Sequence, residues 1–342
     1  MDGLEIARHR LHNQHLTGTP QPDPVAVVRH LGAMQAQEYA VAKWSVAQRT
    51  TGVDDAQMQR LVDDGAIART HALRPTWHFV AAPDLRWIQA VTGPRVHAFN
   101  AYYYRQLGID AELAAKAAGA MMAALADGNH LTRKELGAAL AAAGIEATGN
   151  RLAYLVMYAE LEAQICNGPM RGKQHTYALV SERIPATAPL SEDEGLARLI
   201  ACYFAGHGPA TIKDLAWWSS LTIAQIKRGL SLVEGLESIG GFYYLPPSCP
   251  IAPVDGVWPL QGYDEYVVAY SESKWVFNLA KRAYSLSENA LLHPFIVDGQ
   301  LAGFWRRIVR PSGLVIELPA DLADFASAFD KYAEFAGVPL SI

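Results

Sequence analysis

The sequence predicts an α+β protein in which three consecutive units of helices and a hairpin precede a β-rich end. Three observations lead to this fold class. Helix-start signals recur through the first two thirds of the chain, and each is followed by apolar residues at helical spacing. Each group of helices ends in an extended stretch that contains turn residues. After a proline-rich stretch at 246–253, the pattern of residues favours strands.

We assign the first unit to residues 1–110. Residues 4–16 have the apolar spacing of a helix. Asp23 followed by Pro24 predicts the start of the next helix, because a capping side chain and a proline at the first helical position both favour one. After a further helix, residues 67–80 have the pattern of an extended hairpin.

The second unit, residues 111–185, opens with an alanine-rich helix. Thr132 and Glu135 have the spacing of a capping box, which predicts the start of a second helix. A third helix follows, and then a hairpin whose tip carries Arg171 and Lys173. Three helices followed by a basic hairpin are the order of elements in a winged helix.

The third unit, residues 186–250, repeats this order. Thr211 with Asp214 predicts the cap of its second helix, and Thr222 opens its third helix. Residues 239–245, with paired glycines, predict a short pair of strands like a wing. The second and third units therefore form an internal repeat of pattern, although few of their residues are identical.

The last region, residues 251–342, is predicted to be a small barrel or an α+β unit. Residues 257–276 and 294–318 favour strands, and Val297–Leu301 predicts a hairpin turn around Asp-Gly. Residues 321–335 have the spacing of a closing helix.

The composition argues against several classes of protein. With 51% hydrophobic and 18% charged residues, the chain can bury a core and is not disordered. Its three cysteines are odd in number and far apart, which argues against a disulfide framework and suits a reducing compartment. The N-terminus has no apolar signal segment, and no stretch is long enough to span a bilayer. We therefore expect a cytoplasmic protein associated with the nucleoid.

Charge and motifs restrict the chemistry further. A net charge of −5 argues mildly against nucleic acid binding, but a local basic patch decides that question. His9, His12 and His15 are spaced by three residues and complete no metal-ligand motif, so a polar helix face is the plainer interpretation. Phosphate-loop, nucleophile-elbow and dinucleotide-binding signatures are absent from the sequence. We expect neither a metal nor a cofactor.

A pair of glutamines, Gln35 and Gln37, lies between two predicted helices. In an extended junction their side chains would project to one side, and paired amides are suited to orienting a water molecule. Taken alone, the pattern favours the alternative, which is two surface glutamines at a helix end.

A second polar feature lies on the predicted hairpin of the first unit. On a strand, Arg74, Thr76 and His78 share one face, and Trp77 and Phe79 share the other. Such a polar row can contact phosphate, sugar or base, and a wet strand face explains it equally well.

These stretches together resemble the winged-helix family that includes the AlkZ and YcaQ bacterial DNA glycosylases. The resemblance covers essentially the whole chain. It is carried by short stretches in a characteristic order, namely Arg10–Leu16, Gln35–Gln37, Leu73–His78, Gly262–Tyr266, Val297–Gly299 and Gly303–Arg307.

The resemblance implies three tandem winged helices and a β-rich C-terminal domain, arranged as a C-shaped cradle for DNA. It implies that Gln35 and Gln37 are catalytic, because AlkZ-like members carry Gln-apolar-Gln where the YcaQ type ends in Asp. The implied activity is hydrolysis of the N-glycosidic bond of alkylated purines, and in some members the unhooking of interstrand crosslinks. The implied partner is double-stranded DNA, bound near the lesion by Arg74, Thr76 and His78, and we expect a monomer.

Two other functions remain open from the sequence. A transcription regulator would use the same winged helices to place recognition helices in major grooves, without catalysis. A protein–protein interaction module would suit the acidic balance and the eight tryptophans. Loss of a base from methylated DNA separates the first of these from a glycosylase, and the salt dependence of DNA affinity tests the second.

Overall fold

The computed structural model describes residues 1–247, 251, 253–283 and 292–342. Cys249, and Pro250 of the proline-rich stretch, lie outside the described residues. Within the described part of the chain, helices are too short or too polar to cross a membrane.

Within the first unit, the order of elements that recurs in the other units begins at the predicted Asp23 cap, whose carboxylate accepts a hydrogen bond from the backbone of Val25. Its three strands form an antiparallel sheet in the order β1-β3-β2, so the short first strand pairs with the last. Its elements are α2 (Pro24–His30), β1 (Met34–Gln35), α3 (Tyr39–Ala47), α4 (Asp55–Asp63), β2 (Ile67–Ala72) and β3 (Thr76–Ala81). The predicted hairpin at 67–80 is therefore confirmed.

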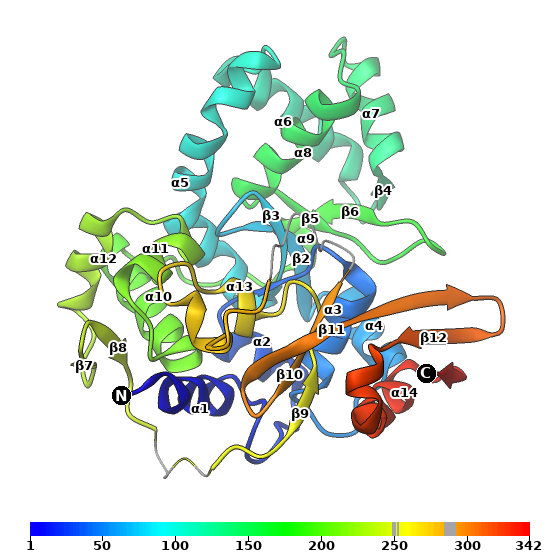
Figure 1. The fold of residues 1–342 in the computed structure, drawn as a ribbon. Helices are drawn as coiled ribbons and strands as arrows, with labels where there is room; N and C mark the ends of the chain where they lie inside the picture. The colour runs from blue at the N-terminus through cyan, green and yellow to red at the C-terminus, as the bar shows by residue number, and fades with distance from the viewer. Residues whose placement is uncertain (248–250, 252, 284–291) are drawn as a thin grey trace.

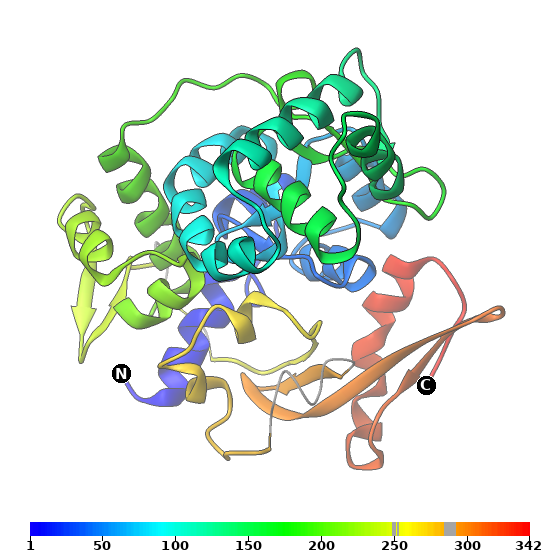
Figure 2. The same ribbon diagram turned by 90° about the horizontal axis from the view of Figure 1, so that it is seen from above.

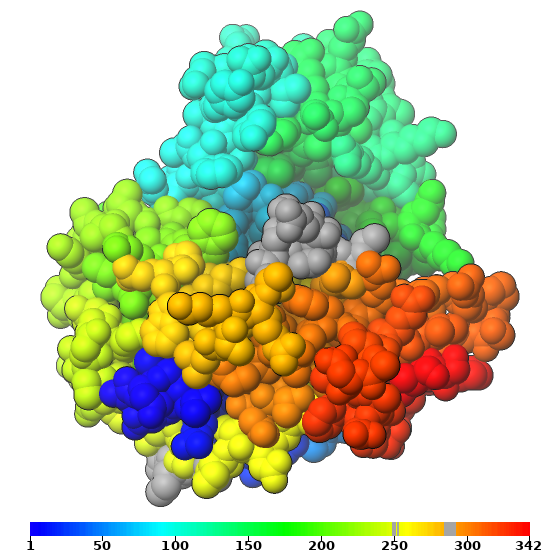
Figure 3. All heavy atoms as spheres, in the orientation of Figure 1, coloured from blue at the N-terminus to red at the C-terminus, as the bar shows by residue number. Residues whose placement is uncertain are grey.

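The second unit has the same order of elements and the same strand order, here β4-β6-β5. The predicted capping box of Thr132 and Glu135 is formed at the start of its second helix. Its elements are α6 (Ala111–Leu125), β4 (Leu131–Thr132), α7 (Arg133–Ala142), α8 (Gly149–Leu161), β5 (Ile165–Asn167) and β6 (Thr176–Leu179). A short helix α9 (Val180–Arg183) follows. Figure 3 shows this unit as a lobe that stands above the rest of the molecule.

The third unit follows the same plan, with a single bridge from Ala210 to Tyr243 in place of the first strand. The predicted caps at Thr211 and Thr222 both form capping boxes. Its elements are α10 (Glu192–His207), α11 (Ile212–Ser219), α12 (Ile223–Leu230), β7 (Glu237–Ile239) and β8 (Phe242–Tyr244). The predicted sequence of three helices and a hairpin is thus present three times.

Two helices outside these repeats connect the units. The first helix, α1 (Gly3–Asn13), packs against α10 of the third unit and η2 (Lys274–Phe277) of the C-terminal region, as Figure 1 shows. The 22-residue helix α5 (Leu85–Gln106) follows a short turn η1 (Ala82–Asp84) and packs against β2, α8 and α10. It therefore contacts all three units.

The C-terminal region is built on a five-stranded sheet in the order β13-β12-β11-β10-β9, which curls without closing into a barrel (Figure 2). Its strands are β9 (Val257–Pro259), β10 (His293–Val297), β11 (Gln300–Arg310), β12 (Gly313–Glu317) and β13 (Leu340–Ser341). The predicted turn joins β10 to β11, with φ values of 49° at Asp298 and 78° at Gly299. Positive φ at both central residues is what this kind of hairpin turn requires.

Two predictions for this region are corrected. Residues after Pro259 in the predicted strand 257–276 form the short helix α13 (Glu265–Val268) and η2 instead. Residues 264–270 of this stretch are buried, and periodicity alone does not separate a buried helical turn from a buried strand. The predicted closing helix is two pieces, η3 (Ala320–Phe329) and α14 (Asp330–Ala336), with a non-helical residue at Phe325.

One hydrophobic cluster joins the first unit to the C-terminal region. Trp44 of α3 is buried against Tyr332 and Phe335 of α14, and Trp305 of β11 packs on Phe329. The indole Nε1 of Trp44 also donates a hydrogen bond to the carbonyl oxygen of Pro259 at 2.9 Å. The first unit and the curled sheet therefore share a core.

A buried ion pair makes a second connection. Arg49, at the end of α3, binds both carboxylate oxygens of Asp264 at 2.7 and 3.0 Å, and both side chains are fully buried. The same carboxylate caps α13 by accepting the N–H of Tyr266. Two charges in the protein interior need each other, because either alone would be an uncompensated buried charge.

We predict that Arg49→Met lowers the free energy of unfolding by about 3–5 kcal/mol, because it leaves Asp264 buried without its partner. Chemical denaturation measures the loss. The control is Arg228→Ala, which breaks an exposed pair with Glu192 and should change stability by less than about 1 kcal/mol. An Arg49→Met protein as stable as the control would contradict this account of the pair.

Candidate active site

The glutamine pair lies at the junction between α2 and α3, where the chain is extended as predicted. Gln35 ends strand β1 and faces His78 across the antiparallel pairing with β3. Gln35 is buried, with 6% of its surface exposed, whereas Gln37 is exposed. The side chain of Gln37 is therefore open to solvent, whereas that of Gln35 is almost completely covered by protein.

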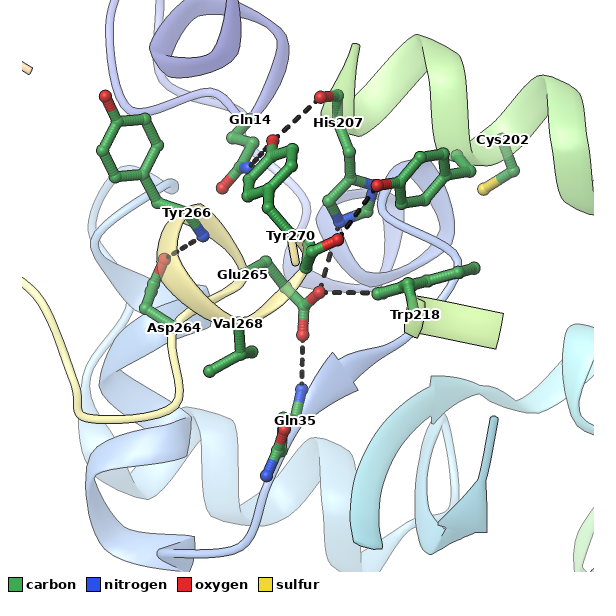
Figure 4. A network of polar contacts seen from close by, with 12 residues as sticks. Gln14, Gln35, Cys202, His207, Trp218, Asp264, Glu265, Tyr266, Val268 and Tyr270 are labelled. Carbon is green, nitrogen blue, oxygen red and sulfur yellow. Dashed lines mark hydrogen bonds and ion pairs between the residues drawn. The ribbon is translucent and has the colours of Figure 1, made fainter. Parts of the chain in front are cut away.

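The backbone of this motif is held by side chains from distant parts of the chain. The N–H of Gln35 donates to Oε1 of Glu265 at 2.8 Å (Figure 4). The carbonyl oxygen of Gln35 accepts from Nε2 of Gln261 at 3.0 Å. The carbonyl oxygen of Ala36 accepts from Nε of Arg69 at 3.0 Å. The position of the motif is thus set by β2 and by the loop that precedes α13.

Each glutamine side chain accepts a hydrogen bond from a group that only donates. Nη2 of Arg74 donates to Oε1 of Gln35 at 3.0 Å, and the backbone N–H of Trp77 donates to Oε1 of Gln37 at 3.3 Å. A guanidinium and a backbone N–H have no acceptor, so the amide atom that faces each of them is the oxygen. Both amide nitrogens are consequently turned away from these partners.

The row Arg74, Thr76 and His78 is not a surface row. Arg74 lies in the turn between β2 and β3 and is 9% exposed, and His78 is fully buried. Nη1 of Arg74 donates to the carbonyl oxygen of Val268 at 3.2 Å, and Nδ1 of His78 donates to that of Thr76 at 2.9 Å. Thr76 is the partly exposed member of the row.

Sequence reasoning gave no role to Glu265, which the structure places beside the motif. Its Oε2 accepts a hydrogen bond from Nε1 of Trp218 at 3.0 Å and lies 3.3 Å from Nε2 of His207. Burial by itself raises the pKa of this carboxyl, but the hydrogen bond and charge of His207 and the charge of Arg74 outweigh burial, and the pKa falls to about 2. The signal that was missed is an acidic residue at the head of the apolar run Tyr266–Val268.

A cavity of about 570 Å³ opens next to Gln35. Gln35, Arg74 and Thr76 lie on one side of it. Aromatic and basic side chains from α5, α11 and the loop before α13 complete the wall, namely Phe99, Arg95, Trp217 and Tyr263. Phe99 is 63% exposed and Trp217 is 51% exposed, which is unusual for large apolar side chains and suits stacking against a planar ligand.

Comparison with known proteins identifies the family. A model of the AlkZ-like DNA glycosylases, described as "DNA glycosylase AlkZ-like", matches residues 28–335. The chain belongs to the AlkZ-like family. An interstrand DNA cross-link repair glycosylase of Streptomyces sahachiroi is 28% identical to it over 330 residues, which cover 88% of this chain and 86% of the relative.

The fold agrees with a solved member of the AlkZ-like family. The structure of Streptomyces sahachiroi DNA glycosylase AlkZ superposes with a TM-score of 0.78 at 22% sequence identity. The match covers 100% of this chain and 99% of that one. The α+β fold, with its curled C-terminal sheet, is therefore the fold of the family.

The basic hairpin of the second unit lies apart from the cavity of this AlkZ-like chain, and neither of its cations is among the cavity-lining residues. Arg171 is paired with Glu135 at 2.7 Å, whereas Lys173 is exposed. The predicted grouping of these residues with Arg74 on one open face is thus not seen at the cavity, because Arg74 is turned into the interior.

Histidines near the site are poor candidates for metal ligands. Within the described residues, no group of three or more His, Cys, Asp or Glu side chains is placed to hold a metal ion. Among the three spaced histidines at the N-terminus, His15 stacks on His30 with ring centroids 4.4 Å apart. That catalysis needs no metal stays a prediction.

Four histidines, of which His78 and His293 are buried, His15 is half-buried and His175 is exposed, make the stability of the fold depend on pH. Burial lowers the pKa of His78 to about 3 and that of His15, His175 and His293 to about 4. These side chains are neutral in the folded protein at pH 6, while in the unfolded chain they begin to bind protons below about pH 6.5. Their contribution to stability is therefore complete above that pH and is lost as the pH falls towards 4.

We predict that the melting temperature falls steadily from pH 6.5 to pH 4 and that His78→Asn makes the fall shallower. An Asn side chain at this position can still donate to the carbonyl oxygen of Thr76 but binds no proton. Because His78 is fully buried, its replacement should decrease the slope of the free energy of unfolding against pH by about 1.4 kcal/mol per pH unit. Thermal melts of both proteins at several pH values test this, and equal slopes would show that His78 is not neutral in the fold.

Proposed function

We propose that this chain is a DNA glycosylase that hydrolyses the N-glycosidic bond of alkylated purines, N7-alkylguanine above all, and that crosslinked guanines are among its substrates. The observation that carries the proposal is the Gln-Ala-Gln motif, held at the edge of an aromatic cavity in a chain of the AlkZ-like family. It would act as a monomer on double-stranded DNA in the cytoplasm.

The three repeated units are proposed to be winged-helix modules that bind this DNA in a C-shaped cradle. Their support is the recurrence of one element order, with the short first strand, or in the third unit the bridge at Ala210, paired to the last strand. We set the modules at residues 1–110, 111–185 and 186–250, with the β-rich domain at 251–342. Winged helices commonly place one helix against the duplex and a hairpin beside it.

The chemistry suits amides because the substrate is already activated. An N7-alkylguanine is cationic, so when the C1′–N9 bond breaks its electron pair neutralises the base, and no acid is needed to protonate it. The oxygen of a water molecule forms the new bond to C1′, and its proton is released to solvent. Gln37, which is exposed and accepts a hydrogen bond from the backbone of Trp77, would hold this water, and Gln35, which lines the cavity, would be its partner in the motif.

Contacts with DNA are proposed at two places. Arg171 and Lys173 on the hairpin of the second unit would bind phosphates. Near the lesion, Thr76 would contact the substrate from the cavity wall, of which Arg74 is also part, whereas His78 is fully buried and does not line the cavity. This arrangement reconciles a basic hairpin with the overall charge of −5, since few exposed cations are needed locally.

We predict that Gln37→Ala slows base release by about 10²–10³-fold, the cost of losing one group that is positioned for the transition state. The side chain is exposed, so stability should change by no more than about 0.5 kcal/mol. Single-turnover release of N7-methylguanine, followed as abasic sites, measures the rate, and a melting curve measures the fold.

Gln35→Ala should slow base release by the same factor as Gln37→Ala or by a smaller one. Full activity of Gln37→Ala would remove its catalytic role, and a collapsed melting temperature would make the residue structural. A wild-type protein that releases no alkylated base but binds one unmodified sequence tightly would instead be a transcription regulator.

We predict that Lys173→Ala weakens binding to duplexes of any sequence and lowers the slope of log affinity against log salt by about 0.9, as expected for one lost phosphate contact. Titrations of a labelled duplex at several salt concentrations give the slope. The control is Lys213→Ala, an exposed lysine already paired with Glu272. Identical slopes for Lys173→Ala and wild type would place the hairpin away from DNA.

A further inference from the structure

The buried guanidinium of Arg74 is aimed at the motif, not at solvent. Its two terminal nitrogens donate to Oε1 of Gln35 and to the carbonyl oxygen of Val268, at 3.0 and 3.2 Å. Only 9% of the residue is exposed. To reach a phosphate, Arg74 would have to break both hydrogen bonds and leave the interior.

The charge of Arg74 is balanced inside the protein. Burial lowers the pKa of Arg74, and the carboxylate of Glu265 opposes that shift. Glu265 is itself held by Trp218 and by the backbone N–H of Gln35. The guanidinium and the carboxylate thus hold Gln35 from two sides, one through its side chain and the other through its backbone.

The consequence is a fixed direction for the amide of Gln35. Because Arg74 has no acceptor, the oxygen of the amide must face it, and the nitrogen faces the opposite way. Figure 4 shows the amide end of Gln35 pointing away from Glu265, and Gln35 lies in the wall of the cavity. Among the hydrogen bonds of the described residues, none uses Nε2 of Gln35.

We propose that Arg74 is a positioning residue that holds Gln35 with its Nε2 donor towards the cavity, where it donates a hydrogen bond to an acceptor atom of the departing purine. The attacking water is then left to Gln37. This assignment rests on the proposed glycosylase function and divides the work between its two glutamines. It also gives Arg74 a role that involves no contact with DNA.

The chemistry of the leaving group favours a donor at this place. As the C1′–N9 bond breaks, its electron pair moves onto the purine, and the carbonyl oxygen and ring nitrogens of the base become stronger acceptors. A donor already oriented in a buried site stabilises that change without reorganisation. An amide that presented its oxygen would meet these acceptors with a like partial charge.

Replacing Gln35 by Glu separates donor from acceptor. Gln35→Glu keeps an oxygen for Arg74 but has no N–H, so the rate of N7-methylguanine release should fall by at least as much as in Gln35→Ala, by about 10²-fold. If Gln35 instead accepts a hydrogen bond from the attacking water, the carboxylate of Gln35→Glu should preserve or raise the rate. That result would overturn the proposal.

Replacing Arg74 by Lys tests whether it acts through Gln35. Lysine keeps the charge but cannot bridge both oxygens, so the single-turnover rate should fall about tenfold or more. The affinity for undamaged duplex and its salt slope should not change. In a Gln35→Ala background, Arg74→Lys should slow the reaction no further, because the group on which it acts is gone.

The matched control is Arg10→Lys. Arg10 is also buried, with 1% of its surface exposed, and it donates to the carbonyl oxygen of Pro209 and to Ser273 without contacting the motif. Arg10→Lys should lower the melting temperature as Arg74→Lys does, while the single-turnover rate stays within about threefold of wild type. An equal loss of rate in both variants would show that the effect of Arg74 is only structural.

Two further results would overturn the role of Arg74. A salt slope lower by about 0.9 in Arg74→Gln, which removes the charge, would make Arg74 a phosphate contact, and additive losses in the Arg74→Lys, Gln35→Ala double variant would make it independent of Gln35. Either result leaves an active wild type and so refutes only this inference. A wild-type protein that releases no base refutes the glycosylase function and this inference together.

Discussion

Two adjacent buried carboxylates, Asp264 and Glu265, determine how the parts of this molecule meet. Neither could stay charged in the interior without partners, and the partners come from distant segments. Asp264 binds Arg49 of the first unit, whereas Glu265 binds His207 of the third unit and the backbone of Gln35. The loop before α13 is therefore the piece on which the first unit, the third unit and the glutamine motif all depend.

This arrangement explains why the proposed site, which relies on amides and not on acids or bases, is built on buried ionised groups. An amide has no charge of its own, and its effect depends on which end faces the reacting atoms. Arg74 and Trp77, each a donor, settle that question for Gln35 and Gln37. The ionised groups Glu265 and Arg74 thus hold Gln35, and the wall of the cavity beside it carries the aromatic side chains of Phe99, Trp217 and Tyr263.

The overall charge of −5 is consistent with a DNA-binding role once the cations are considered one by one. Several exposed basic residues are already paired, such as Arg171 with Glu135 and Arg228 with Glu192. Other basic residues, such as Arg49, are buried and paired inside the protein, so they cannot contact DNA. Only local exposed cations such as Lys173 remain to meet phosphates, so the sum over the sequence says little about the binding face.

The sequence by itself determined the helices, the hairpins and the motif, because these depend on neighbours a few residues apart. The caps at Asp23, Thr132 and Thr211 and the turn at Asp298 form hydrogen bonds or backbone angles that a short stretch encodes completely. The resemblance carried by short stretches of the sequence also indicates the family, which the match over residues 28–335 confirms.

Only the tertiary structure decided which polar residues are buried and with whom. The sequence predicts that Arg74 and His78 lie on a strand face that contacts DNA or is merely wet, yet both are interior, and it assigns no role to Glu265 although that residue contacts the motif. The partners that stabilise a buried charge lie far away in the chain, 230 positions from Gln35 to Glu265 and 263 from Arg10 to Ser273. No local pattern records such distances, and so the burial of a charge, unlike a helix cap, is decided by the packing of the whole molecule.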